Sequence, residues 1–206
     1  MTYEEVIDQL KNIQITPSNS NADGRVNSIK DEDNIIKLLK SIAGDENIIE
    51  PPPRWWYDVK ICGVPVQIKS STGRADNFSS KKGILYALTT LTEQEIDSMS
   101  ANTPWTKFEE LLLTKSSDKP RDYNIIALDK KNKKVHHKTL LTLSKLTSNG
   151  NNLPFQIPWK HNWTEEPVQR NAEEAREFII SCYVESVQKK MNQHKNIQLL
   201  KESYIA

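Results

Sequence analysis

The chain has 206 residues, of which 36% are hydrophobic and 27% charged, as in an ordinary folded globular protein. Its 28 basic and 27 acidic residues give a net charge of +1. This balance argues against a protein that binds non-specifically as a polycation, but it is compatible with a local basic cleft. Two distant cysteines, Cys62 and Cys182, predict neither a disulfide framework nor a zinc site. The acidic N-terminus is unlike a signal peptide and no apolar run approaches about 20 residues, so we expect a cytoplasmic protein with no membrane association.

Two helices are expected in the first 45 residues. Apolar residues recur at helical spacing in residues 2–13, and the turn-forming residues of 16–28 predict a loop. Ser28 is the expected N-cap of the second helix. The apolar stripe of that helix consists of Ile35, Ile36, Leu39 and Ile42. Three prolines, Pro51 to Pro53, then favour an extended segment.

The rest of the chain mixes strands and helices. A hairpin is expected over residues 57–70, followed by a loop over 70–80 and a helical or mixed stretch over 81–99. Residues 122–140 predict a strand, a lysine-rich turn and a second strand, with 129–138 as a solvated tip that could also touch phosphates. Residues 148–163 predict a loop with at most a short strand, and about 169–195 one long helix that serves as core or dimer seam. This order of elements predicts an α/β fold with a central mixed β-sheet flanked by helices.

The hairpin sequence, "YDVKICGVPVQIKS", separates its side chains by polarity. If Cys62 and Gly63 form a two-residue turn, Val59 faces Val66 and Asp58 faces Gln67. Alternation along each strand then gives one apolar face, made of Val59, Ile61, Val64, Val66 and Ile68. The other face carries Asp58, Gln67 and Lys69. A half-exposed hairpin with a polar outer face explains the pattern equally well.

The polar face has the groups of a hydrolytic site. Asp58 offers a carboxylate and the carbonyl of Ile68 a second oxygen, while Lys69 could orient or deprotonate a water. Hard divalent ions such as Mg²⁺ prefer oxygen ligands and retain several waters, one of which can attack a phosphodiester.

Asp58 followed by Gln67-Ile68-Lys69 resembles the motif of the PD-(D/E)XK nuclease superfamily, and within it the type II restriction endonucleases. That motif is an acidic residue on one strand, then an acid, any residue and lysine on the next. Gln67 departs from it, because an amide can ligate a metal through its oxygen but brings no charge.

Many members of the superfamily add a glutamate from a preceding helix. Asp31, Glu32 and Asp33 are the candidates here. Glu32 lies three, four and seven residues before apolar positions, which places it on the core-facing stripe with the two aspartates on its flanks, and this selects Glu32. Favourable charge at a helix N-terminus is the alternative explanation for all three acids.

The resemblance implies a restriction-endonuclease-like core in a single nuclease domain, 1–206. The catalytic core would span about 20–140, the DNA-recognition segment about 145–165 and the C-terminal helix about 169–195. Mg²⁺ would be the cofactor, with Glu32, Asp58 and Ile68 as ligands, Gln67 as an auxiliary and Lys69 positioning water. The substrate would be double-stranded DNA in a prokaryotic cytoplasm, cut by a homodimer, with a cognate DNA methyltransferase encoded nearby. The alternative is a non-catalytic nucleic-acid-binding or interaction protein whose hairpin is purely structural.

Three segments offer polar and basic side chains that suit base edges and phosphates. Turn formation alone also explains their composition. The candidate DNA-binding residues are Asn21, Arg25, Ser70, Arg74, Asn77, Lys81, Lys82, Asn151, Asn152, Gln156, Lys160, His161 and Asn162. Trp55 and Trp56 are expected to be packing anchors rather than base stackers.

Overall fold

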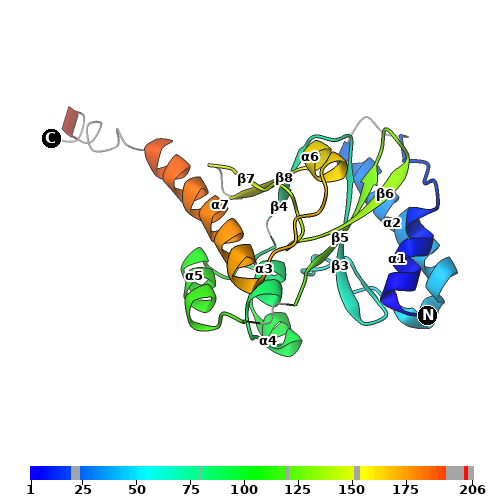
Figure 1. The fold of residues 1–206 in the computed structure, drawn as a ribbon, viewed down its shortest axis with the longest axis horizontal. Helices are drawn as coiled ribbons and strands as arrows, with labels where there is room; N and C mark the ends of the chain where they lie inside the picture. The colour runs from blue at the N-terminus through cyan, green and yellow to red at the C-terminus, as the bar shows by residue number, and fades with distance from the viewer. Residues whose placement is uncertain (20–23, 79, 119–120, 151–153, 194–201, 204–206) are drawn as a thin grey trace.

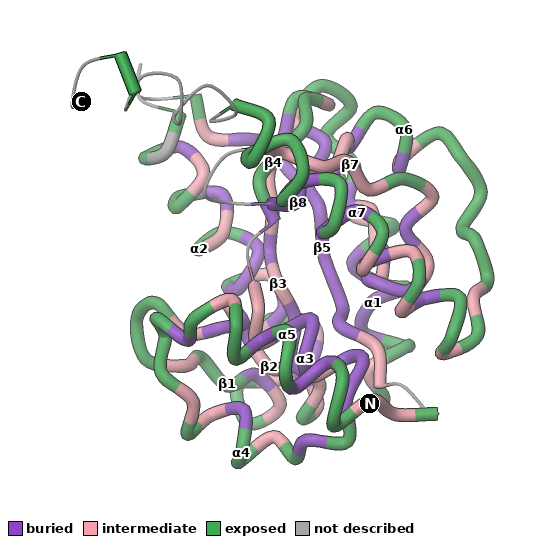
Figure 2. Tube along the Cα trace, turned by 90° about the vertical axis from the view of Figure 1, so that its left-hand side faces the viewer, coloured by how far each residue is buried: buried purple, intermediate pink, exposed green. Residues whose placement is uncertain are grey.

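The computed structural model describes residues 1–19, 24–78, 80–118, 121–150, 154–193 and 202–203. A mixed β-sheet lies at the centre, and helices cover both of its faces (Figures 1 and 2). This architecture confirms the predicted fold class, a central mixed β-sheet flanked by helices.

The central sheet has five strands in the order β1-β2-β3-β5-β6. The strands are β1 (Ile48–Ile49), β2 (Val59–Ile61), β3 (Val64–Ser71), β5 (Asn124–Asp129) and β6 (Lys134–Thr139). Neighbouring strands are antiparallel except β3 and β5, which pair in parallel. A parallel pair needs a long crossover connection, and the connection here contains one short strand and three helices. Strand β5 is buried along its whole length (Figure 2), as expected for a strand covered on both faces.

The hairpin has the predicted register. Val59 pairs with Val66 and Ile61 with Val64, and both turn residues, Cys62 and Gly63, have positive φ. A turn with two positive φ angles matches the right-handed twist of its strands, which fixes the pairing. The predicted sidedness of the hairpin is therefore confirmed.

The apolar side of the hairpin packs against α1 (Tyr3–Lys11) and α2 (Gly24–Ala43). A short 3₁₀ helix, Asp45–Asn47, follows α2 in the chain. The first helix begins at a capping box formed by Thr2 and Glu5. The second begins at Gly24, so the prediction of Ser28 as its N-cap is wrong. Ser28 lies inside the helix, where its hydroxyl donates to the carbonyl of Gly24 at 2.9 Å. The predicted loop, 16–28, therefore extends too far, because its last residues belong to the helix.

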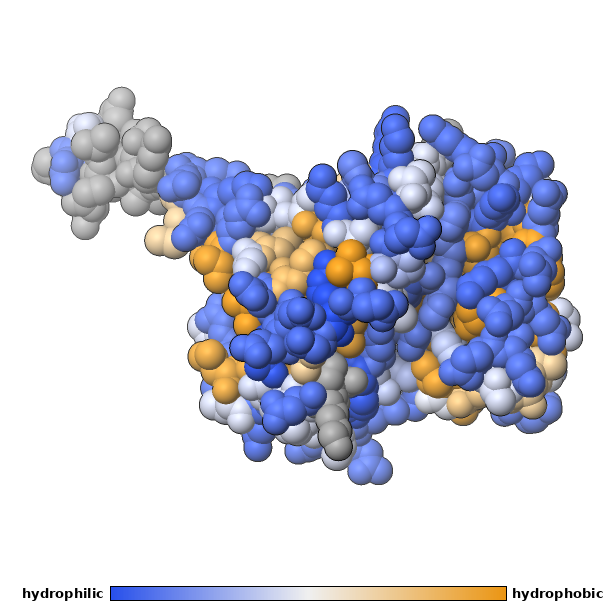
Figure 3. Space-filling view, in the orientation of Figure 1, coloured by the Kyte–Doolittle hydropathy of each residue, from blue (hydrophilic) through white to orange (hydrophobic). Residues whose placement is uncertain are grey.

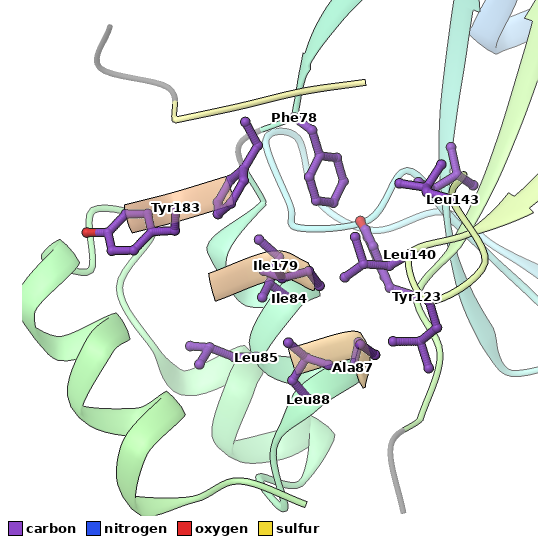
Figure 4. Packing of buried hydrophobic residues seen from close by; sticks show 14 of the residues in the cluster. Phe78, Ile84, Leu85, Ala87, Leu88, Tyr123, Leu140, Leu143, Ile179 and Tyr183 are labelled. Atoms are coloured by element: carbon purple, nitrogen blue, oxygen red, sulfur yellow. The ribbon is translucent and has the colours of Figure 1, made fainter. Parts of the chain in front are cut away.

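The opposite face of the sheet is covered by four helices around a larger apolar core. They are α3 (Lys81–Leu88), α4 (Glu93–Ser98), α5 (Trp105–Thr114) and α7 (Ala172–Gln193). Figure 4 shows side chains of this core, among them Phe78, Ile84, Tyr123 and Ile179, converging from the helices and the sheet.

A second sheet of three strands, in the order β4-β8-β7, was not predicted. It consists of β4 (Ala75–Phe78), β8 (Phe155–Pro158) and β7 (Thr147–Ser148), with α6 (Trp159–Thr164) directly after β8. The two segments were predicted to be mainly loop because their composition is that of turns. Pairing across 79 residues, with Asn77 opposite Gln156 and the buried Phe78 opposite Phe155, overrides that local preference.

Helix α7 contributes to the core along only part of its predicted stripe. Ala175, Ile179 and Cys182 are buried, whereas Val187 and Met191, predicted on the same side, are exposed. Figure 3 shows apolar patches in the region of α5 and α7, on a face of the molecule that is otherwise largely hydrophilic. No helix among the described residues has the length and apolar character needed to cross a lipid bilayer.

Candidate active site

Asp58 lies immediately before β2 and is held by the backbone of the hairpin. Its own N–H donates to the carbonyl of Val66 at 3.0 Å, and its Oδ2 accepts from the N–H of Ile68 at 2.6 Å. Gln67 donates a further hydrogen bond from Nε2 to the same oxygen. Burial raises the pKa of Asp58, while the bond from Ile68, the charge of Lys69 and the bond from Gln67 oppose that shift. The carboxylate is therefore fixed in place, and these favourable interactions offset only part of the cost of burying its charge.

Glu32 reaches this site from α2. Burial, and then repulsion by Asp58, raise its pKa to about 7, while the charge of Lys69 has the opposite effect. Glu32 and Asp58 line one cleft of about 160 Å³. The helix and the hairpin thus bring together two carboxylates that repel each other, with a lysine close enough to attract both.

Asp31, predicted to lie on the flank of α2, is instead its buried acid. It is 1% exposed, pairs with Lys130 at 2.7 Å, and accepts from the N–H of Ser18 at 2.6 Å. Positions 27, 31, 35 and 39 form the centre of the buried side of α2, whereas Glu32 lies at its edge. The prediction that Glu32 lies on the core-facing stripe is therefore wrong in detail. Glu32 is half-buried at the edge of that stripe, and from there it borders the site. Lys130 was predicted within a solvated tip and is instead an internal counter-ion.

Gln67 presents its nitrogen, not its oxygen, to Asp58. Its Oε1 lies 3.1 Å from the hydroxyl of Tyr123, on the side of the amide away from Asp58. In this orientation Gln67 is a hydrogen-bond donor to the carboxylate. The carbonyl of Ile68 as a metal ligand stays a prediction.

A larger cleft of about 470 Å³ lies beside the first, lined in part by Gln67 and Lys69. Pro53, Arg54 and Trp55 line both clefts, so this short segment forms the ridge between them. Its backbone is unusual, because Arg54 has a φ of 65°. The two tryptophans were predicted to be packing anchors. This is confirmed for Trp56, which is buried and donates to Asp97 at 2.7 Å. The half-buried Trp55 packs against the same core and also lines both clefts.

The larger cleft is basic. Four cationic side chains line it, and Asp97 is the one acid among its described lining residues. The cations are Arg54, Lys69, Lys81 and Lys82. Burial lowers the pKa of both Lys81 and Lys82, whose ammonium groups donate to the backbone carbonyls of Thr103 and Asp97. Such a cleft attracts an anionic ligand.

The predicted DNA-binding residues are brought together only in part. Asn77 lines the basic cleft, and its Oδ1 accepts from Gln156 at 3.2 Å, so two predicted segments meet across β4 and β8. Arg74 and Lys160 are exposed, Ser70 is half-buried, and His161 pairs with Glu165 at 3.0 Å within α6. Asn21, Asn151, Asn152 and the side chain of Arg25 lie outside the described residues.

Asn162 is not available to DNA, which corrects its assignment. The side chain is 0% exposed, and its amide nitrogen donates to the carbonyls of Lys145 at 2.9 Å and Pro158 at 3.1 Å. Its oxygen accepts from the N–H of Lys145 at 3.3 Å. Asn162 therefore ties α6 to the segment before β7, a structural role.

Asp76 is a carboxylate near Lys69 for which the sequence predicted no catalytic or metal-binding role. It lies on β4 and accepts from the indole N–H of Trp159 at 2.8 Å. Burial raises its pKa, and the charges of Lys69 and Lys130 are among the opposing influences. No local pattern marks it, because its position depends on the pairing of β4 with a strand about 80 residues away.

The oxygen atoms of Glu32 and Asp58 are the kind of ligand that a hard cation prefers, but two carboxylates are fewer ligands than a complete site would have. Among the described residues there is no group of three or more His, Cys, Asp or Glu side chains that could hold a metal. Glu32 and Asp58 are nevertheless two half-buried oxygen donors whose repulsion a divalent cation would relieve. Amide, carbonyl and water oxygens would have to complete the shell.

Replacing Glu32 by glutamine is expected to stabilise the protein at alkaline pH. A carboxyl whose folded-state pKa is raised contributes stability below its ordinary value of 4.5, and that contribution is lost as pH rises through about 7. Glu32→Gln should therefore raise the free energy of unfolding by roughly 1–2 kcal/mol at pH 8, after allowance for its partial exposure. At pH 4 the two proteins should be equal. Urea denaturation at both pH values measures this.

The matched control for that experiment is Glu177→Gln, an exposed site on α7. It should leave stability unchanged at both pH values. A gain for Glu32→Gln that persists at pH 4 would mean that packing, not charge, is responsible.

A comparison with solved structures finds a weak structural likeness to a known protein. No family model matches the chain, and no curated protein matches it. A solved structure described as a restriction endonuclease in complex with substrate DNA has 18% sequence identity and a TM-score of 0.29. The match covers 61% of this chain and 55% of that one, so the chain spans only about half of that structure.

Proposed function

We propose that the protein is a Mg²⁺-dependent endonuclease of type II restriction character that hydrolyses phosphodiester bonds in double-stranded DNA. One observation carries this proposal. Glu32 from α2 and Asp58 and Lys69 from the hairpin interact electrostatically beside a basic cleft of about 470 Å³. Paired carboxylates suit a divalent cation, and a basic cleft suits a phosphate backbone.

Each side chain then has a distinct role. Glu32 and Asp58 would hold Mg²⁺, which when bound neutralises charge on the phosphate and activates a water. Lys69 would position the attacking water and stabilise the charge that develops on the phosphoryl oxygens. Lys81 and Lys82, in the wall of the basic cleft, would hold the strand through its phosphates.

Incubation of the purified protein with phage DNA, with and without Mg²⁺, tests the proposal. Discrete fragments that appear only with Mg²⁺ are expected. Smearing would point to a non-specific or repair-type nuclease. Intact DNA that still binds the protein would refute the proposal and favour a binding function.

A non-catalytic nucleic-acid-binding or interaction protein is the second candidate, and Gln67 favours it. The amide removes one negative charge from the motif and turns its nitrogen toward Asp58. A binding protein needs the basic cleft but no cation, so it would retain full DNA affinity in EDTA and would leave the DNA intact when Mg²⁺ is added.

The remaining parts of the proposal follow from double-strand cleavage in a restriction system. Two copies, each cutting one strand, would form a homodimer on a palindromic site. Leu113, Val184 and Val187 are exposed apolar side chains of α5 and α7, and they line a groove that would be the candidate seam. A cognate DNA methyltransferase encoded nearby would protect host DNA in a prokaryotic cytoplasm.

A further inference from the structure

Tyr123 has no role in the proposed chemistry, yet its hydroxyl lies at the back of the site. The residue precedes β5, is 0% exposed, and packs against Trp56 and Phe78. Its oxygen contacts two carbonyl-type oxygens, the backbone carbonyl of Trp56 and the side-chain Oε1 of Gln67. Burial raises the pKa of this phenol, so the hydroxyl keeps its proton.

One proton cannot satisfy both oxygens. A tyrosine hydroxyl donates a single hydrogen bond and can accept others. The contact with the Trp56 carbonyl is the shorter, which favours the proton there, although the Ser80 hydroxyl also donates to that carbonyl at 3.3 Å. The contact with Gln67 is 3.1 Å. When the proton serves Trp56, the phenolic oxygen faces the amide oxygen of Gln67 with no hydrogen between them, which leaves that amide oxygen poorly satisfied.

A half-turn of the Gln67 amide would remove this conflict. The two amide orientations have nearly the same shape. After the turn, Nε2 would donate to the phenolic oxygen of Tyr123, whose proton stays on the carbonyl of Trp56. The amide oxygen would then face Asp58, where it would repel the carboxylate unless a cation lies near both.

We propose that Tyr123 is a positioning residue that supports the Gln67 amide in the orientation that offers its oxygen to a divalent cation. The inference rests on the proposed function, because it needs the cation that Glu32 and Asp58 would hold. It explains how glutamine can serve where the resembled motif has a carboxylate. Without a cation the amide donates to Asp58, and with one it turns and Tyr123 accepts its nitrogen.

A double-mutant cycle with Mg²⁺ affinity as its readout tests the inference. Isothermal titration calorimetry of the full chain should show that Tyr123→Phe weakens Mg²⁺ binding by about 3- to 10-fold, the worth of one ordinary hydrogen bond. In a Gln67→Leu background, Tyr123→Phe should change the affinity by less than 2-fold, since no amide is left to orient. Circular dichroism melts confirm that each variant is folded.

The side-chain amide resonances of Gln67 give a second measurement that leaves Tyr123 intact. These ¹⁵N-labelled NH₂ signals, assigned by their loss in Gln67→Leu, should shift on titration with Mg²⁺. A Tyr123→Phe effect of equal size in both backgrounds, or resonances of Gln67 that do not respond to Mg²⁺, would overturn the positioning role alone. Absence of any Mg²⁺ binding by the wild type would overturn the proposed function together with this inference.

Discussion

Lys69→Ala is expected to lower the rate of DNA cleavage in Mg²⁺ by about 100-fold or more while leaving DNA affinity within about 3-fold. Loss of a single preorganised group that stabilises developing charge typically has an effect of this size. Lys69 lines the basic cleft and interacts with Asp58, Glu32 and Asp76. Other cationic side chains of the cleft, Lys81 among them, remain to hold the phosphates. Plasmid-cleavage time courses measure the rate, and fluorescence anisotropy with Ca²⁺ in place of Mg²⁺ measures the affinity.

Lys131→Ala is the matched control, because this lysine is exposed between β5 and β6. It removes the same charge from the chain and should cut at the wild-type rate. Asp58→Ala should behave like Lys69→Ala, since it removes the carboxylate at the centre of the site. Cleavage by Lys69→Ala at the wild-type rate would show that the site assignment is wrong.

The parts of the site that lie close in sequence could be predicted from it. The turn at Cys62 and Gly63 fixes the register of the hairpin, and alternation then fixes which side chains share a face. The interaction of Asp58 with Gln67 follows from these two local rules. Neither rule depends on the rest of the chain.

The surroundings of the site could not be predicted, because they depend on contacts between distant segments. Strand β4 forms only by pairing with β8, and this pairing places Asp76 and Asn77 near Lys69 and the basic cleft. The orientation of the Gln67 amide depends on Tyr123, 56 residues away. Composition and spacing carry no information on either contact.

Asp31 and Glu32 show how a small error in helix phase exchanges two adjacent roles. The buried side of α2 is centred on the row that contains Asp31, Ile35 and Leu39. Spacing to apolar residues alone could not separate this row from its neighbour, because the buried side is wide enough to include parts of both. The ion-pair partner of Asp31 decides the matter, and this partner, Lys130, comes from the turn directly after β5.

Lys130→Met is expected to lower the free energy of unfolding by about 3–5 kcal/mol, because it leaves a buried carboxylate without its counter-charge. Asp31 is 1% exposed and Lys130 15%, and their charged atoms lie 2.7 Å apart. Methionine keeps much of the length and apolar contact of the lysine stem, so the loss isolates the charge. Urea denaturation at neutral pH measures it.

The double variant Asp31→Asn/Lys130→Met separates loss of charge balance from loss of packing. Asparagine keeps an oxygen that can accept from the N–H of Ser18, so most of the stability should return. Because this ion pair links α2 to the turn after β5, Lys130→Met should also loosen the position of Glu32 and slow cleavage, and the double variant should recover both. A Lys130→Met protein within about 1 kcal/mol of the wild type would contradict the role of this pair in holding α2 against the sheet.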